Sequence, residues 1–141
     1  MTIRTAHATW NGTLKQGAGR VKLGSGVFEG AYSFPSRFEN GPGTNPEELL
    51  GAAHAGCFTM ALSKILGEAG LTAEKLETTA EVTLAQVEGA FTITTVHLTL
   101  KGKVPGADQA KFQELAAKAK AGCPVSKVLR AEISLDASLA D

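Results

Sequence analysis

One long helix is predicted for residues 45–68, which read NPEELLGAAHAGCFTMALSKILGE. Asn45 can cap the first turn, Pro46 suits the first helical position, and Glu47 lies where the helix dipole favours a negative charge. Gly70 follows the segment and is typical of a helix end. We therefore expect an uninterrupted helix of about six turns.

The apolar side chains of this helix cover nearly its whole circumference instead of one stripe. They are Leu49, Leu50, Ala52, Ala53, Ala55, Cys57, Phe58, Met60, Ala61, Leu62, Ile65 and Leu66. A helix that is apolar on all sides is expected to be buried on all sides. One sheet of a short chain cannot cover every face. We therefore expect a second subunit to cover the remaining faces of the helix. The alternative is that the chain's own hairpins wrap it.

The rest of the chain alternates between strand-like and helical segments. Period-two alternation predicts the strands, and Glu88-Gly89 predicts a hairpin turn. The strands are expected at 5–14, 21–23, 30–34, 75–87, 90–104 and 130–135, the helices at 107–121 and from 124 onward, and an exposed loop at 35–42. No repeat or linker interrupts this order, so residues 1–141 are expected to form a single α+β domain.

Composition argues against several classes of function. The 141 residues carry 14 Lys and Arg against 14 Asp and Glu, so no charge footprint for nucleic acid or an anionic membrane is visible. We find no run of about 18 uncharged apolar residues and no signal peptide, so no membrane association is expected. Neither the histidines nor the cysteines show metal-ligand spacing, so no metal or other cofactor is expected. We predict a soluble, cytoplasmic protein.

The two cysteines, Cys57 and Cys123, are the candidate nucleophiles. In a reducing compartment they are expected to be free thiols at rest, which disfavours a permanent structural bridge. Burial in an apolar helix raises the pKa of the Cys57 thiol, so reactivity there requires a nearby cation. Cys123 precedes Pro124 at the N-cap of a short helix, where the dipole favours a thiolate. Local reasoning leaves open which cysteine attacks.

Arg37 is the first candidate for the cation, because its segment leads directly into the long helix and a guanidinium keeps its charge. The alternatives that spacing leaves open are Arg4, Arg20 and Arg130. Glu47 is able to hold an arginine through a two-pronged ion pair, although a first-turn acid that compensates the dipole is the simpler interpretation. Glu47 and Cys57 are separated by about 15 Å of straight helix. If one arginine contacts both, we expect Glu47 to come from a second subunit.

His54 precedes Cys57 by three positions and lies on the neighbouring turn. The spacing suggests a Cys/His pair for acyl transfer, as in an acyl hydrolase. No orienting carboxylate accompanies the pair, so a histidine satisfied by backbone or water is the simpler interpretation. A non-catalytic binding or dimerisation module is the other alternative, and it would tolerate Cys57→Ser without loss of function.

Two motifs resemble those of a known family. Residues 45–58, NPEELLGAAHAGCF, and 120–126, KAGCPVS, closely resemble the OsmC/Ohr family of osmotically inducible and organic hydroperoxide resistance proteins. The likeness extends along the chain and favours the OsmC branch. It implies an OsmC-like fold with antiparallel sheets around a long buried central helix, in an entwined homodimer. It also implies a thiol-dependent peroxidase that reduces organic hydroperoxides, and hydrogen peroxide less well.

The same resemblance implies a role for each site residue. Cys57 would be the peroxidatic thiolate, Cys123 the resolving cysteine of an intramolecular disulfide, Arg37 the activating cation, and Glu47 its partner from the other subunit. In the Ohr branch the arginine comes earlier, near where Arg20 stands. The family indicates dihydrolipoyl groups as the thiol reductant, with thioredoxin or a small thiol as alternatives. The side chains expected to select the organic part of the substrate are Phe38, Phe58 and Met60.

Overall fold

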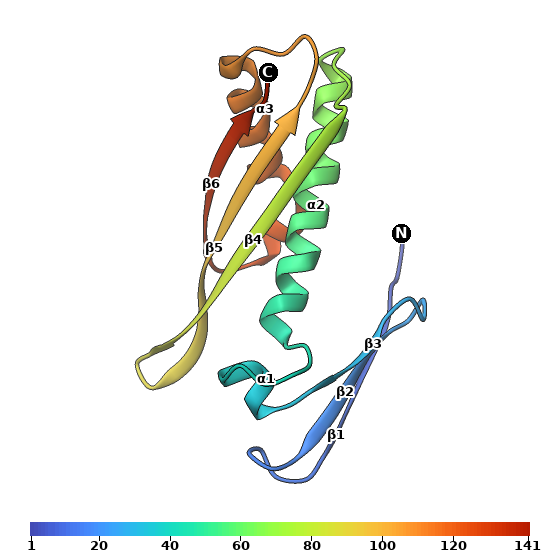
Figure 1. Cartoon of the computed structure of the whole chain (residues 1–141), viewed down its shortest axis with the longest axis vertical. Helices are drawn as coiled ribbons and strands as arrows, with labels where there is room; N and C mark the ends of the chain where they lie inside the picture. The colour runs from blue at the N-terminus through green and yellow to red at the C-terminus, as the bar shows by residue number, and fades with distance from the viewer. The chain divides into compact units, whose positions relative to one another are not determined.

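The computed structural model describes residues 1–141, which divide into two compact units (Figure 1). The first unit covers Met1–Leu49 and the second covers Leu50–Asp141. Each unit contains a three-stranded sheet of its own, with the strand orders β1-β2-β3 and β4-β5-β6.

The first unit is built on an antiparallel meander. Its strands are β1 (Ala6–Asn11), β2 (Ala18–Leu23) and β3 (Glu29–Tyr32). Gly19 in the middle strand pairs with Trp10 on one side and Tyr32 on the other, and a side chain at Gly19 would collide with both rings. The glycine therefore lets the two rings approach to 5.4 Å between centroids, a cross-strand contact that stabilises this register. The three predicted strands are confirmed, with shifted ends.

A short helix, α1 (Phe34–Phe38), replaces much of the loop predicted for residues 35–42. The N–H of Ser36 donates to the hydroxyl of Ser33 at 3.2 Å, and the N–H of Ser33 donates to the hydroxyl of Ser36 at 2.8 Å. Pro35 lies in the first turn, where its missing N–H is harmless. The prediction of a loop is wrong because this reciprocal capping outweighs the turn-like composition.

The long helix α2 (Pro46–Glu68) begins and ends close to the predicted positions. Oδ1 of Asn45 accepts a hydrogen bond from the N–H of Glu48 at 2.7 Å, so Asn45 caps the first turn as predicted. At the other end Gly70 has φ +76°. The N–H of the next residue returns to the carbonyl of Leu66 at 2.8 Å, which completes a Schellman motif.

In the single chain, α2 is buried along one side only. Phe58, Leu62 and Leu66 belong to the core, whereas Met60 is 77% exposed. The exposed face continues along small residues, namely Ala52, Ala53, Gly56, Ser63 and Gly67. One chain therefore does not achieve the burial on all sides that the composition predicts.

By length and composition alone, α2 is also apolar enough to cross a membrane, with a mean hydropathy of 1.4 over its most apolar window. The expectation that no run of about 18 uncharged apolar residues occurs is met, because Lys64 interrupts the apolar run of α2 after Ser63. The helix nevertheless reaches this mean hydropathy with its charged residues included. One such helix is weak support for a membrane span, since core helices of soluble proteins pass the same test. The buried side of α2 packs in a protein core and also carries the fully buried His54.

The sheet of the second unit combines two kinds of pairing. Its strands are β4 (Lys75–Val87), β5 (Ala90–Lys103) and β6 (Glu132–Leu139). β4 and β5 form the predicted antiparallel hairpin, in which Glu88 and Gly89 have φ +50° and +82°, as in a type I′ turn. β6 pairs with β5 in parallel, so the expectation of antiparallel sheets is wrong for this pair. A helical crossover connects the two strands, as parallel neighbours require.

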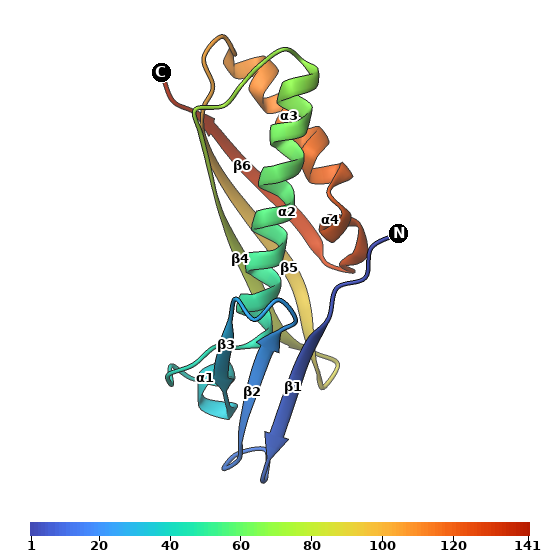
Figure 2. The ribbon, with the colours of Figure 1, turned by 90° about the vertical axis from the view of Figure 1, so that its right-hand side faces the viewer.

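Two helices form the crossover, α3 (Gln109–Gly122) and α4 (Pro124–Val128). Figures 1 and 2 show α2 and α3 against the same face of this sheet. The core of the unit lies between these helices and β5, and its buried side chains include Phe58, Leu62, Leu66, Val96, Leu98, Leu100, Phe112, Leu115, Ala116 and Ala119. Cys123 belongs to this core and stands where α3 gives way to α4.

Candidate active site

The Sγ atoms of Cys57 and Cys123 lie 2.8 Å apart in the second unit. Cys57 projects from the middle of α2 and is half-buried, whereas Cys123 is fully buried. Cys123 ends α3 and begins α4, and its extended backbone bends the chain between these helices. Both side chains are free thiols, so the fold brings together two sulfur atoms that are 66 positions apart in the sequence.

The two thiols have opposite electrostatic surroundings within this unit. Burial raises the pKa of Cys57, and its hydrogen bond with Cys123 raises that pKa further. Burial also acts to raise the pKa of Cys123. Hydrogen bonds outweigh this effect and lower the pKa, and they come from Cys57 and from the main chain and hydroxyl of Ser126. Within this unit Cys123 is therefore the sulfur that more readily carries negative charge, and Cys57 needs an additional cation.

His54 is fully buried one turn before Cys57. Its Nε2 atom lies 2.7 Å from Oγ of Ser126, whereas its Nδ1 atom is buried and has no hydrogen-bond partner. Burial lowers the pKa of His54, so the imidazole is neutral near pH 7. Sequence reasoning missed Ser126. Its position in the sequence could have indicated it. Ser126 comes three residues after Cys123, at the N3 position of the short helix that Cys123 precedes, where a polar side chain can interact with the N-cap residue.

Arg37 and Glu47 form an ion pair inside the first unit. Nε of Arg37 donates to Oε1 of Glu47 at 2.8 Å, and the two side chains are 35% and 11% exposed. The expectation that Glu47 reaches Arg37 from another subunit is corrected, because α1 and the start of α2 bring the two together within one chain. The contact uses only Nε of Arg37, so it is not the two-pronged ion pair that was expected. The second carboxylate oxygen of Glu47, Oε2, is buried without a hydrogen-bond partner.

The alternative arginine, Arg20, has a different environment. Its Nη2 atom lies 3.1 Å from Oε2 of Glu29 on the neighbouring strand, and both side chains are about half exposed. Surface ion pairs of this kind contribute little to stability. Arg37, by contrast, has a buried carboxylate as its partner.

A cavity of about 320 Å³ opens beside Arg37 in the first unit. It is lined by Trp10, Leu14, Tyr32, Ser33, Phe34, Arg37 and Phe38. The guanidinium carbon of Arg37 lies 5.3 Å from the ring centroid of Phe38. Of the three side chains predicted to line a substrate pocket, Phe38 lines this cavity. Phe58 is fully buried in the core of the second unit, which contradicts the prediction for that residue.

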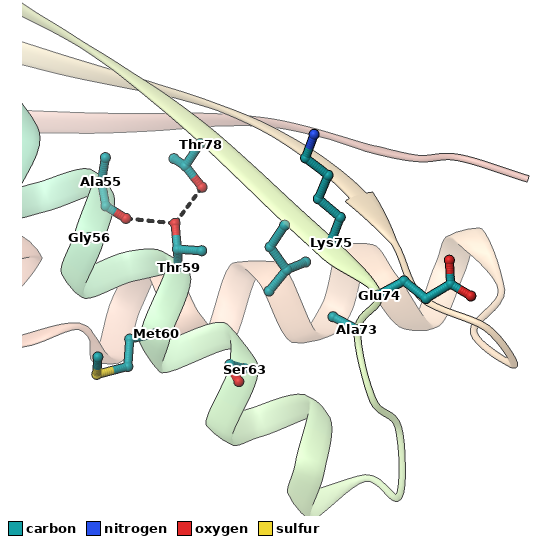
Figure 3. Close-up of a pocket in the computed structure, with 10 residues that line it drawn as sticks. Ala55, Gly56, Thr59, Met60, Ser63, Ala73, Glu74, Lys75 and Thr78 are labelled. Carbon is teal, nitrogen blue, oxygen red and sulfur yellow. Dashed lines mark hydrogen bonds between the residues drawn. The ribbon is translucent and has the colours of Figure 1, made fainter.

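A second cavity, of about 620 Å³, lies along the exposed face of α2 and includes Met60 (Figure 3). Its lining residues are Ala55, Gly56, Thr59, Met60, Ser63, Ala73, Glu74, Lys75, Leu76 and Thr78. The hydroxyl of Thr59 donates to the carbonyl of Ala55 at 2.6 Å and lies 2.7 Å from the hydroxyl of Thr78 on β4. Neither cysteine lines this cavity, so we treat it as a surface feature of α2 and not as the site of thiol chemistry.

Comparison with known proteins agrees with these features. The OsmC family, described as OsmC-like protein, matches residues 39–138. Peroxiredoxin OsmC of Escherichia coli (strain K12) is 52% identical over 141 residues, which cover 99% of each chain. An organic hydroperoxide resistance protein of Xanthomonas axonopodis pv. citri (strain 306) is 32% identical over 146 residues, which cover 98% of this chain and 95% of that protein.

Solved structures share the fold. The organic hydroperoxide resistance protein OhrB of Bacillus subtilis superposes with a TM-score of 0.73 at 29% identity, over 95% of this chain and 98% of that one. An OsmC-like protein of Vibrio cholerae O1 biovar eltor gives a TM-score of 0.80 at 18% identity, over 98% and 100% of the two chains, which supports the fold alone. Together with the match to residues 39–138, these similarities show that the chain belongs to the OsmC family.

Proposed function

We propose that this chain is a thiol peroxidase that reduces organic hydroperoxides, and hydrogen peroxide less well, through a reversible Cys57–Cys123 disulfide. The observation that carries the proposal is the 2.8 Å separation of two free sulfur atoms. The names of the relatives, Peroxiredoxin OsmC and Organic hydroperoxide resistance protein, support the same activity.

Two steps account for the oxidative half of the reaction. The Cys57 thiolate attacks an oxygen of the hydroperoxide, the O–O bond breaks, and the departing alkoxide takes a proton to become an alcohol. Cys57 is then a sulfenic acid. The Cys123 thiolate attacks its sulfur, the S–O bond breaks, and the departing hydroxide takes a proton to become water. The disulfide keeps the two oxidising equivalents until a thiol donor reduces it.

Arg37 is proposed as the cation that activates Cys57, because burial by itself raises the pKa of that thiol. Near pH 7 only about 3% of an ordinary thiol is ionised, and lowering its pKa by two units would raise that fraction to about three-quarters. Glu47 holds Arg37 through Nε alone. The terminal nitrogens are therefore left to stabilise the thiolate and the charge that develops on the departing oxygen.

The active form is proposed to be a homodimer. The exposed face of α2 carries Met60 and a row of small residues that permit close approach of a second helix. Ten residues of helix, about 15 Å, separate Glu47 from Cys57. Because Arg37 is bonded to Glu47, we propose that this pair serves Cys57 of the other subunit.

The other participants follow from the same proposal. The aromatic cavity beside Arg37 offers an apolar site for the organic part of the hydroperoxide, which favours alkyl and aryl hydroperoxides over hydrogen peroxide. The reductant is proposed to be a dihydrolipoyl group, with thioredoxin or a small thiol as alternatives, in the cytoplasm. The family match runs across the boundary at Leu49, which supports one domain over residues 1–141.

Thiol titration with one equivalent of cumene hydroperoxide tests the proposal. Wild-type protein is expected to lose both thiols and release the alcohol. Cys123→Ser is expected to keep a trappable sulfenic acid on Cys57, and Cys57→Ser is expected to consume no peroxide. A Cys57→Ser variant that consumes peroxide at the wild-type rate would overturn the assignment of the attacking sulfur. Wild-type protein that keeps both thiols would overturn the peroxidase itself.

The same titration separates the alternatives. An acyl hydrolase would require His54 to take the proton of Cys57. Nε2 of His54 is engaged with Ser126, and Nδ1 has no hydrogen-bond partner, so neither ring nitrogen is bonded to the thiol. Such an enzyme would leave the thiol count unchanged after peroxide. A non-catalytic module would show neither thiol loss nor any effect of Cys57→Ser.

A further inference from the structure

A chain of polar side chains leads from His54 through Ser126 to Cys123. Nε2 of His54 lies 2.7 Å from Oγ of Ser126. Ser126 is the third residue of α4, which Cys123 precedes at the N-cap, and its hydroxyl acts as a donor that lowers the pKa of the Cys123 thiol. The Cys123 sulfur in turn lies 2.8 Å from that of Cys57. His54 and Cys123 are both fully buried, so the chain joins α2 to α4 inside the second unit.

The direction of these hydrogen bonds follows from the environment of the ring. Nδ1 of His54 is buried without a partner, and a buried N–H without an acceptor is more unfavourable than a buried lone pair. The ring proton of the neutral imidazole therefore belongs on Nε2, where it donates to Ser126. The serine hydroxyl, having accepted there, donates its own proton to the Cys123 sulfur.

We propose that His54 and Ser126 form a donor relay that stabilises the Cys123 thiolate and so accelerates formation of the Cys57–Cys123 disulfide. This inference rests on the proposed peroxidase. Ser126 contacts the reacting sulfur directly, whereas His54 is a positioning residue that acts through Ser126.

The relay acts on the second of the two chemical steps. In that step the S–S bond forms, the S–O bond of the Cys57 sulfenic acid breaks, and the electron pair leaves with hydroxide. The proton that Cys123 gives up on ionising balances the hydroxide as water. Because hydrogen bonds to an anion are stronger than those to its neutral form, donors aimed at Cys123 favour the thiolate that this step consumes.

Within the second unit, no charged side chain takes the place of the relay. On α3, Lys120 donates to the carbonyl of Ile133, and on α4 Lys127 is exposed. The titratable groups that face Cys123 are Cys57 and, through Ser126, His54 on α2. The remaining neighbours in the core are apolar. Once Cys57 is oxidised and no longer donates as a thiol, the Ser126 hydroxyl acts on the anion together with the main-chain N–H groups of Ser126 and Val125. It is the only one of these donors that a side-chain substitution removes.

The rate of disulfide formation as a function of pH tests the inference. Reduced full-length protein is mixed with one equivalent of cumene hydroperoxide, quenched by alkylation, and analysed by mass spectrometry from pH 5 to 10. Ser126→Ala is expected to slow disulfide formation about tenfold near pH 7, which corresponds to a rise of about one pH unit in the midpoint of the profile. At high pH, where Cys123 ionises without help, the variant and wild-type rates should converge.

Variants at His54 and a second histidine–serine pair supply the controls. His54→Leu removes the donor and is expected to shift the profile in the same direction, whereas His54→Gln restores a donor near the Nε2 position and should recover most of the rate. Combining His54→Leu with Ser126→Ala is expected to add little to Ser126→Ala alone. Ser134→Ala breaks the 2.6 Å contact between Ser134 and His97 on the sheet, and it should leave the profile unchanged.

Two results would overturn the relay. An unshifted profile in Ser126→Ala would show that the hydroxyl does not stabilise the thiolate. A rate lowered equally at every pH would indicate a structural effect, and Ser126→Thr, which keeps the hydroxyl, would then fail to restore the profile. Either result leaves the peroxidase intact as long as wild-type protein still loses both thiols to peroxide.

Discussion

Arg37 and Glu47 are bonded to each other within a single chain, through one nitrogen and one oxygen that lie 2.8 Å apart. The bond joins the last turn of α1 to the first turn of α2. It therefore orients the guanidinium before any second subunit arrives. Whichever site receives Arg37 also receives the carboxylate that holds it.

Removing that carboxylate is expected to slow the first chemical step. Glu47→Ala frees Arg37 from its fixed orientation, and we expect the rate of sulfenic acid formation with cumene hydroperoxide to fall by up to about 100-fold. Stopped-flow measurement in the Cys123→Ser background isolates this step. Glu29→Ala, which breaks the exposed pair with Arg20, is the matched control and should keep the starting rate. Equal rates in the two variants would exclude Glu47 from the site.

Mixing two inactive variants determines which subunit supplies the cation. Arg37→Ala and Cys57→Ser chains are refolded together in equal amounts and assayed with cumene hydroperoxide. If Arg37 acts across the interface, one site of each mixed dimer is complete, and about a quarter of the wild-type sites should be recovered. Unmixed samples of each variant are the control. Activity no higher than that of the unmixed samples would contradict action between subunits.

A charge on the exposed face of α2 is expected to weaken the dimer. Met60 is 77% exposed in one chain, and Met60→Glu would bury a carboxylate at the proposed interface. Light scattering coupled to size-exclusion chromatography should show a shift from the dimer mass towards the monomer mass on dilution. Val87→Glu, at the tip of the hairpin, introduces the same charge elsewhere and should remain dimeric. A monomeric wild-type protein would refute the dimer directly.

The buried histidine makes stability depend on pH. Burial lowers the pKa of His54 in the folded chain, so below the unfolded value of about 6.5 the unfolded chain binds more protons. Stability from this group is present above pH 6.5 and is lost as the pH falls towards the folded pKa, by at most about 1.4 kcal/mol per pH unit. Urea midpoints at pH 7 and 5.5 measure the loss. His54→Gln should reduce it, and His7→Gln, at an exposed histidine, is the matched control.

Core packing against α2 should dominate the stability of the second unit. Phe58 is fully buried, so Phe58→Ala is expected to lower the free energy of unfolding by about 3–5 kcal/mol. Phe91→Ala removes the same atoms from a residue that is 57% exposed and should cost less than about 1 kcal/mol. Urea unfolding followed by circular dichroism compares the two. Similar losses in both variants would contradict the assignment of the core.

Local signals predicted the elements whose ends are determined by nearby residues. Asn45 caps α2, and Glu88 with Gly89 closes the hairpin, because both depend on interactions within a few positions. The parallel placement of β6 was missed because pairing direction depends on the crossover, which alternation along one strand does not encode. Helix α1 was missed because Ser33 and Ser36 cap each other in a segment whose composition favours a turn.

The site was predictable only in part, for a similar reason. The residues alone identified Cys57 and Cys123 as candidate nucleophiles, and the motif resemblance supplied their roles. The fold brings their sulfur atoms together. The partner of His54 was not predictable, since Ser126 is 72 positions away and no pattern links the two. The Arg37–Glu47 bond was expected between subunits because a helix-length estimate says nothing about the path of the segment before α2.

The unequal burial of the two sulfur atoms has a consequence for the regeneration of the enzyme. Thiol–disulfide exchange requires in-line access of the incoming thiolate to one sulfur, with the other as the leaving group. Cys57 is half-buried and Cys123 is fully buried, so the reductant reaches the disulfide at Cys57 and expels Cys123. The sulfur with the lower pKa is the better leaving group, and in this unit that sulfur is Cys123. In the proposed cycle the mixed disulfide is therefore expected on Cys57, and the reductant is expected to enter where the peroxide enters.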